Sequence, residues 1–358
     1  MKAIRILCAA FIALAPMQVV AAETDTLPVW SWFGDSLMRA ERLDGIPRAD
    51  DTFDRVWARG RFGAQFDPSP QWHFAISAKA SKANNANDQD RRDNRNERSN
   101  AIGLDRLYAR WQATESAALT LGKTELPLDL TPLTWDRDLR PVGMSADVST
   151  EVGEFNRFAL VGGYFAGSHL YGDDSRIAAA QVAYHWREGA PLNASALVAY
   201  LDFSDLSQAA LQGLTRTNRK LGSGLLSDYR LVDVQLVGRA RAGAWPLELR
   251  LDLVRNLGAD DLRDGARASL VLGDMRQPHT WEFGFAAERI QRDAVMAAFN
   301  SDDWWFHSNM RGVMPWIGYG IDGTWSMRLA GFRERRDGVS VHTHRVMLDL
   351  NASFGGRP

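Results

Sequence analysis

Arginines recur at even spacings in several short stretches of this sequence. The residues concerned are Arg55, Arg59, Arg61, Arg106, Arg110, Arg239, Arg241 and Arg250. Guanidinium groups that line a water-filled path can favour the passage of anions. Alternatively, each arginine pairs with a carboxylate and stabilises a wall without selecting any solute. The near-neutral sequence, with 42 basic and 44 acidic residues, favours the paired arrangement.

Even spacing indicates β-strands, because alternate side chains of a strand lie on one face. In residues 246–258, PLELRLDLVRNLG, leucines occupy positions 247, 249, 251 and 253, with Glu248, Arg250 and Asp252 between them. The leucines could fill a soluble core, or they could face lipid while the charges face a lumen. The second arrangement predicts these lumen-facing side chains: Arg55, Arg59, Arg61, Arg106, Tyr108, Arg110, Arg239, Arg241, Glu248, Arg250 and Asp252.

The N-terminus predicts export from the cytoplasm. Lys2 and Arg5 precede an apolar run, which ends in the small residues Ala21 and Ala22. This pattern is typical of a signal peptide over residues 1–22, leaving residues 23–358 as a single mature domain. Cys8 is the only cysteine and lies in the predicted signal, so disulfides, a catalytic cysteine and a cysteine-ligated zinc are excluded from the mature chain.

Alternation over much of the chain predicts about 16 antiparallel strands. Fifteen are expected at 32–43, 54–66, 71–82, 101–113, 117–124, 154–166, 175–187, 191–203, 228–242, 246–258, 265–275, 279–292, 309–321, 323–334 and 345–354. Short turns should alternate with long external loops, and this order fails unless residues 142–148 form one more strand. The sequence therefore predicts an all-β, transmembrane, up-and-down β-barrel with short periplasmic turns.

Tryptophans support the membrane barrel. They lie near the predicted periplasmic strand ends at Trp32, Trp72, Trp111, Trp186, Trp245, Trp281 and Trp325. Indole rings favour the headgroup layer, where membrane barrels carry aromatic girdles. A secreted soluble all-β protein is the alternative, but it gives no reason for tryptophans to gather at one end.

Two long stretches resemble a known family. The first stretch is IGLDRLYARWQ with LTLGKTELPLDLTPLTWDRDLRPVG, and the second is GARASLVLGDMRQPHTWEFGFAAERIQRDAVMAAFNSDDWW. Both are similar to runs of the putative-porin family of proteobacterial outer membranes. The likeness covers most of the mature chain and is most specific over 101–143 and 265–312. It departs from the family at Trp304-Trp305-Phe306 and in the GGRP that follows Phe354. The resemblance implies a pore-forming barrel of a Gram-negative outer membrane, in contact with lipid, for small hydrophilic solutes.

The connection from about Thr124 to Arg140 is the candidate constriction loop. By analogy with 16-stranded porins, we expect it to fold inward and narrow the pore. The hypothesis places opposed charges there, at Asp129, Asp136, Arg137, Asp138 and Arg140, across from the eight evenly spaced arginines named above, which we call the arginine ladder. The alternative is a loop that packs on the rim of the barrel.

Passive diffusion of small hydrophilic solutes, with or without an anion bias, has two alternatives. A dedicated exporter of an anionic polysaccharide would also use an arginine-lined lumen. An embedded hydrolase is disfavoured because His73, His185 and His307 are scattered and no GxSxG occurs, so no enzyme is expected. No cofactor, metal or nucleic-acid partner is predicted: His342 with His344 is better explained as strand rim. A homotrimer is suggested by analogy alone.

Overall fold

The computed structural model describes residues 28–47, 52–84, 100–167, 175–207, 209 and 213–355. The predicted signal peptide, residues 1–22, lies outside these residues and stays a prediction. The strands of the described residues are β1 (Val29–Asp44), β2 (Phe53–Ser69), β3 (Trp72–Ala83), β4 (Ala101–Thr114), β5 (Ala117–Lys123), β6 (Val142–Val152), β7 (Asn156–Ala166), β8 (Arg176–Trp186), β9 (Asn193–Ser204), β10 (Lys220–Leu221), β11 (Gly224–Leu225), β12 (Tyr229–Ala242), β13 (Trp245–Asn256), β14 (Asp264–Gly273), β15 (Trp281–Ile290), β16 (Met310–Gly320), β17 (Trp325–Arg336) and β18 (Thr343–Phe354).

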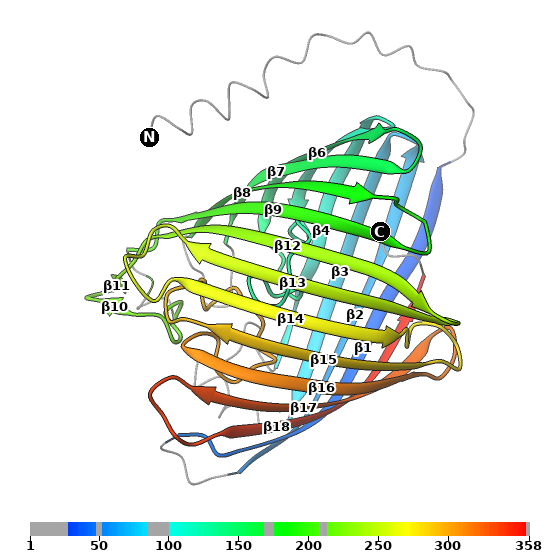
Figure 1. The fold of residues 1–358 in the computed structure, drawn as a ribbon. Coiled ribbons are helices and arrows are strands. Elements are labelled where there is room, and N and C mark those ends of the chain that lie inside the picture. Colours follow the sequence, from blue (N-terminus) through cyan, green and yellow to red (C-terminus); the bar gives the residue numbers. More distant parts are fainter. Residues whose placement is uncertain are drawn as a thin grey trace.

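Sixteen of these strands form one closed antiparallel barrel (Figure 1). Barrel strands that follow one another in the chain pair with each other, β9 with β12 included, and β1 pairs with β18 from Gly34 opposite Phe354 to Asp44 opposite His344. β10 and β11 form a separate small hairpin in the connection between β9 and β12. The predicted fold and strand number are confirmed, including the strand inferred at 142–148, which is β6. Among the described residues, no helix is long and apolar enough to span a membrane.

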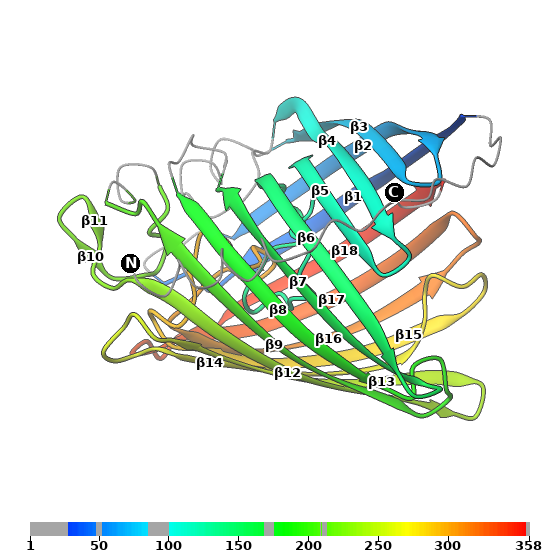
Figure 2. The ribbon, with the colours of Figure 1, turned by 90° about the horizontal axis from the view of Figure 1, so that it is seen from above.

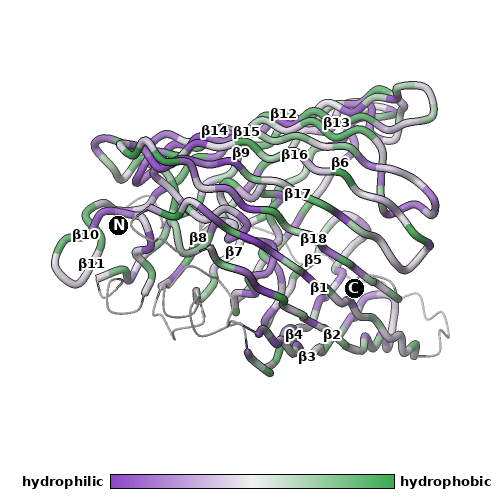
Figure 3. Tube along the Cα trace, turned by 90° about the horizontal axis from the view of Figure 1, so that it is seen from below, coloured by the Kyte–Doolittle hydropathy of each residue, from purple (hydrophilic) through white to green (hydrophobic). Residues whose placement is uncertain are grey.

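The outer face of the barrel is apolar and the inner face is polar. In β13, Leu249, Leu251 and Leu253 are exposed on the outside, while Asp252 is buried within. Figure 3 shows the same alternation of hydrophobic and hydrophilic residues along the other strands. This settles the choice left open by the leucine pattern: the leucines form the lipid-facing surface of a membrane barrel.

Aromatic side chains gather at the ends of the strands joined by short turns. Trp30 stacks on Phe66 with ring centroids 4.7 Å apart, and Trp281 contacts Tyr319 at 4.7 Å. Trp32 and Trp72 are likewise exposed there. These rings form the periplasmic girdle predicted from the tryptophan positions. Figure 2, seen from above, shows how strongly the strands tilt across the barrel between this end and the other.

Candidate functional site

The connection between β5 and β6, residues 124–141, enters the barrel and follows its inner wall; we call it the first inward loop. The Asp129 carbonyl accepts hydrogen bonds of 2.9 Å from the side chains of Gln181 on β8 and Gln235 on β12. Further along, the hydroxyl of Thr131 donates to Asp252 on β13. The first inward loop is therefore bound to the wall far from the strands that carry it.

Beyond Thr134 the first inward loop returns across the lumen to β2. The Asp138 carboxylate lies 2.5 Å from Arg59 and 2.7 Å from Arg61. Burial would raise the pKa of Asp138, but Arg59 and Arg61 hold it well below its usual range. Asp138 therefore stays ionised at neutral pH and fixes the loop to the arginine ladder.

A second connection, residues 291–309 between β15 and β16, also folds into the barrel; we call it the second inward loop. Its apolar run from Ala294 to Phe299 is almost fully buried. The Trp135 ring of the first inward loop stacks on Phe299 at 5.5 Å, and the Asp136 amide donates to the Phe299 carbonyl at 2.7 Å. The two inward loops thus share a hydrophobic core inside the barrel, which includes Leu133 of the first inward loop and inward-facing side chains of the wall such as Leu201.

The far end of the second inward loop is held by charges of β1, β17 and β18. Asp303 lies 2.8 Å from Arg39, and Arg345 donates to the carbonyl of Asp302 at 3.0 Å. The carboxylate of Glu334 accepts the backbone N–H groups of Trp305 and Phe306 at 2.8 and 2.9 Å. Burial would raise the pKa of Asp303, but Arg39, Arg328 and Arg345 lower it to about 2.

A cavity of about 150 Å³ remains where the two inward loops approach β1 and β2. Its basic side chains are Arg39 and Arg137, and its acidic ones are Asp136, Asp138, Asp302 and Asp303. At about 30 Å³ per molecule of liquid water, it has room for roughly five water molecules. The cavity is therefore lined by charges of both signs.

A β-bulge brings one more carboxylate to the site. The pairing of β3 with β4 shifts between Ser77 and Ala78, so that Asp105 and Arg106 are both buried on the inner side. Asp105 lies 3.4 Å from Arg61 and 3.8 Å from Arg140. Alternation alone assigns Asp105 to the outer face, so sequence reasoning missed it. The sequence feature that reveals the bulge is the odd spacing between Leu104 and Leu107. Two outward-facing residues of a regular strand are an even number of positions apart, so this spacing breaks the period of two.

Arg55 belongs to a buried ion-pair cluster. Its side chain contacts Glu41 on β1, and Glu41 also receives the guanidinium of Arg345 on β18. The exposed fractions of the three side chains are 0% for Arg55, 1% for Glu41 and 3% for Arg345. Since none of them reaches open solvent, Arg55 has little access to a solute path. This cluster joins the first strand to the last across the seam that closes the barrel.

The remaining predicted site residues also lie on the inner side, and most are paired. Their partners include Glu125 at 2.5 Å for Arg106 and 3.1 Å for Arg140, Asp147 at 2.8 Å for Arg110, Glu248 at 2.8 Å for Arg239, Asp129 at 3.0 Å for Arg250, and the Ala244 carbonyl at 3.2 Å for Arg241. Tyr108 is half-buried between Arg106 and Arg110 on β4, whereas Arg137 is exposed. Asp252 is 1% exposed because Thr131 covers it.

The second inward loop was not predicted as part of the site. The sequence indicated only a long external connection there. The sequence feature that indicates its burial is the apolar run Ala294–Phe299, which is followed by Trp304-Trp305-Phe306. An external loop in water has no reason to carry nine apolar residues in thirteen.

Comparison with known proteins decides the family. Residues 35–218, more than half of the chain, match the family described as Putative porin. The chain belongs to the putative-porin family. This porin is a channel for passive diffusion of small hydrophilic solutes across the outer membrane of a Gram-negative bacterium. The family and the fold point to a channel rather than an enzyme.

Solved structures show the same fold for this porin. OprB of Pseudomonas putida is 14% identical with a TM-score of 0.59, over 92% of this chain and 94% of that one. OpdK of Pseudomonas aeruginosa is 11% identical with a TM-score of 0.55, over 92% of this chain and 99% of that one. A BenF-like porin of Pseudomonas fluorescens is 9% identical with a TM-score of 0.54, over 92% of this chain and 99% of that one. No curated protein matches the sequence.

Proposed function

We propose that this porin is a narrow channel of weak ion selectivity, and that its solute limit is set between the two inward loops. The observation that carries the proposal is the cavity of about 150 Å³ bordered by charges of both signs. Opposed charges across a constriction create a transverse field, which orients polar and zwitterionic solutes without excluding either ion. The preferred solutes are therefore small and dipolar.

Pairing of the arginine ladder supports weak rather than anionic selectivity. Arg59 and Arg61 share Asp138, Arg110 forms two hydrogen bonds with Asp147, and Arg250 contacts Asp129. An arginine neutralised by a carboxylate adds little to the field along the pore. The same pairing, together with the two folded loops in the lumen, disfavours an exporter of anionic polysaccharide. A homotrimer remains a prediction by analogy.

Reversal potentials in a planar bilayer test this proposal. Under a tenfold salt gradient we expect a value much nearer zero than the limit of about 59 mV of an ideally selective pore. In Asp138→Asn/Asp303→Asn the value should move toward the anion limit, because Arg59, Arg61 and Arg39 each lose one carboxylate partner. Glu188→Gln serves as the control, because Glu188 pairs with Arg157 outside the constriction. A wild-type value near either limit would contradict the proposal.

The same measurement has a defined pH dependence. The pKa values of Asp138 and Asp303 are both lowered, the latter to about 2. Both carboxylates therefore keep their charge from neutral pH down to about pH 4, near the ordinary pKa of an aspartate, and Asp303 loses it only as pH approaches 2. The reversal potential should be the same at pH 7 and pH 4. A shift toward anions already at pH 5 would show that these carboxylates do not set the selectivity.

A further inference from the structure

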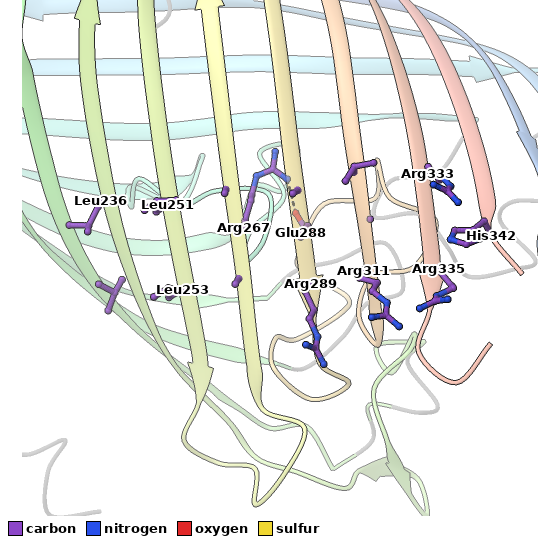
Figure 4. Close-up of a pocket in the computed structure, with 16 residues that line it drawn as sticks. Leu236, Leu251, Leu253, Arg267, Glu288, Arg289, Arg311, Arg333, Arg335 and His342 are labelled. Atoms are coloured by element: carbon purple, nitrogen blue, oxygen red, sulfur yellow. Dashed lines mark hydrogen bonds and ion pairs between the residues drawn. The ribbon is translucent and has the colours of Figure 1, made fainter. Parts of the chain in front are cut away.

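The outer wall of the barrel carries an arginine row that the solute path does not use. In register, Arg289 on β15 lies opposite Arg311 on β16, and Arg311 lies opposite Arg335 on β17. Two positions nearer the periplasm, Arg333 on β17 lies opposite His344 on β18. Figure 4 shows Arg289, Arg311 and Arg335 side by side near the ends of their strands, with Arg333 and His342 beside them. We call Arg289, Arg311, Arg333 and Arg335 the outer arginine row.

Among the described residues, the outer arginine row has no carboxylate partner. Like charges directly opposite one another destabilise a sheet unless a counter-charge lies nearby. Yet within the part of the chain that the structure describes, no carboxylate lies within 4.0 Å of any of these four guanidinium groups. Desolvation, and then the charges of Arg333 and Arg335, lower the pKa of His342 in the adjoining turn. The charged neighbours that add to this lowering are all basic side chains.

Arginines elsewhere on the same outer rim are compensated. Arg255 on β13 lies 2.6 Å from Asp264 on β14. Arg230 on β12 lies opposite Asp202 on β9. The lack of acidic partners is therefore a local property of β15–β17 rather than a general feature of the rim.

The height of the row places it at the outer headgroup layer. On β15, Arg289 is eight positions from the girdle residue Trp281, and on β16 Arg311 is eight positions from Tyr319. Eight residues span about 26 Å along a strand, or about 20 Å along the membrane normal at a tilt near 40°. Since the apolar band of such barrels is about 25 Å tall, the guanidinium groups lie near its external boundary.

Below the row the outer wall is hollowed. A groove of about 730 Å³ is bordered by the arginines and continues over Ala266, Ala268 and Ala287, with Leu251 and Leu253 along one side. These side chains all face outward, as their register with Leu253, Arg289 and Arg311 requires. The groove is thus apolar toward the membrane centre and strongly basic at the headgroup level.

We propose that this groove binds a phosphorylated lipid of the outer leaflet, with its phosphate groups against the outer arginine row and its acyl chains over the alanines. Arginine binds phosphate oxygens through paired, charge-assisted hydrogen bonds, which suits a row of closely spaced guanidinium groups. A membrane lipid fits better than free phosphate because the apolar part of the groove requires acyl chains. The proposal does not depend on how the pore conducts.

Binding of lipid A to the full-length mature porin in detergent, followed by native mass spectrometry, tests the proposal. Diphosphoryl lipid A should bind, and the variant with all four arginines changed to glutamine should bind at least about tenfold more weakly. The matched control is Arg230→Gln/Arg255→Gln, which removes two outward arginines of the same rim and should leave the affinity unchanged. Equal losses in both variants would overturn the proposal.

Two further arms separate specific lipid binding from general attraction. Monophosphoryl lipid A should bind the native porin more weakly than the diphosphoryl form, and the difference should vanish in the fourfold variant. Millimolar inorganic phosphate should not displace the lipid; displacement would point to a simple anion site and overturn the lipid assignment. Should the fourfold variant fail to refold, the single variant Arg311→Gln, at the centre of the row, should still lose severalfold affinity, and an unchanged affinity there would refute the proposal.

Discussion

Replacing residues 128–138 with a short Gly-Ser linker should raise the single-channel conductance of this porin about twofold or more. These residues carry the part of the first inward loop that follows β8, β12 and β13 and then crosses to Arg59 and Arg61. A barrel of 16 strands leaves an aqueous lumen when no loop fills it, and conductance increases with the open cross-section. Conductance steps in a planar bilayer measure the effect directly.

The control for the shortened loop is a change in a loop that stays outside the barrel. Deleting Val339 and Ser340 from the exposed turn between β17 and β18 should leave the conductance unchanged. Both variants should first be shown to refold, by their heat-modifiable migration. If the 128–138 variant refolds and conducts like the native porin, the first inward loop does not limit the pore.

Glu41→Gln should lower the free energy of unfolding by about 3–5 kcal/mol, the usual cost of breaking a buried ion pair by removing one partner. Glu41 lies between Arg55 and Arg345, and all three side chains are almost fully buried. The substitution leaves two guanidinium groups facing a neutral amide in a site that water does not reach. Because Arg55 lies on β2 and Arg345 on β18, the loss weakens the seam where the barrel closes. Urea unfolding in lipid vesicles measures the change.

Glu188→Gln is the matched control for this effect. Glu188 pairs with Arg157 at 2.7 Å, but the two side chains are 46% and 33% exposed. Exposed pairs contribute about 0–1 kcal/mol, so the control should stay close to the native stability. A loss below 1 kcal/mol for Glu41→Gln as well would mean that water reaches the cluster and the charges are not confined.

Much of the barrel could be predicted from the sequence because each strand separates lipid from water. The period of two in residues 246–258 is required by that separation, and it survives in β13 residue by residue. The strand at 142–148 was found from connection lengths rather than from its own composition. It was recoverable because a closed barrel needs an even number of strands with alternating short and long connections.

The site was harder to predict because it depends on contacts between distant residues. Alternation indicates that Arg59 and Asp252 face inward, but it cannot say that Asp138 will pair with the first or that Thr131 will cover the second. The bulge at Asp105 changes the face of a single residue, which a period-two pattern assigns wrongly. The second inward loop escaped because its apolar residues match no strand or helix period, although their presence in an external connection is itself unusual.

Swelling of proteoliposomes in isotonic solutions of graded solutes tests the central claim most directly, namely that this barrel is a passive channel narrowed by two inward loops. We expect rapid swelling with glycine and other small polar or zwitterionic solutes, and swelling that falls steeply from monosaccharides to disaccharides. Swelling no faster than in protein-free liposomes for every solute, with refolded and inserted porin, would contradict a passive channel. Equal rates for glycine and a disaccharide would contradict the narrowing.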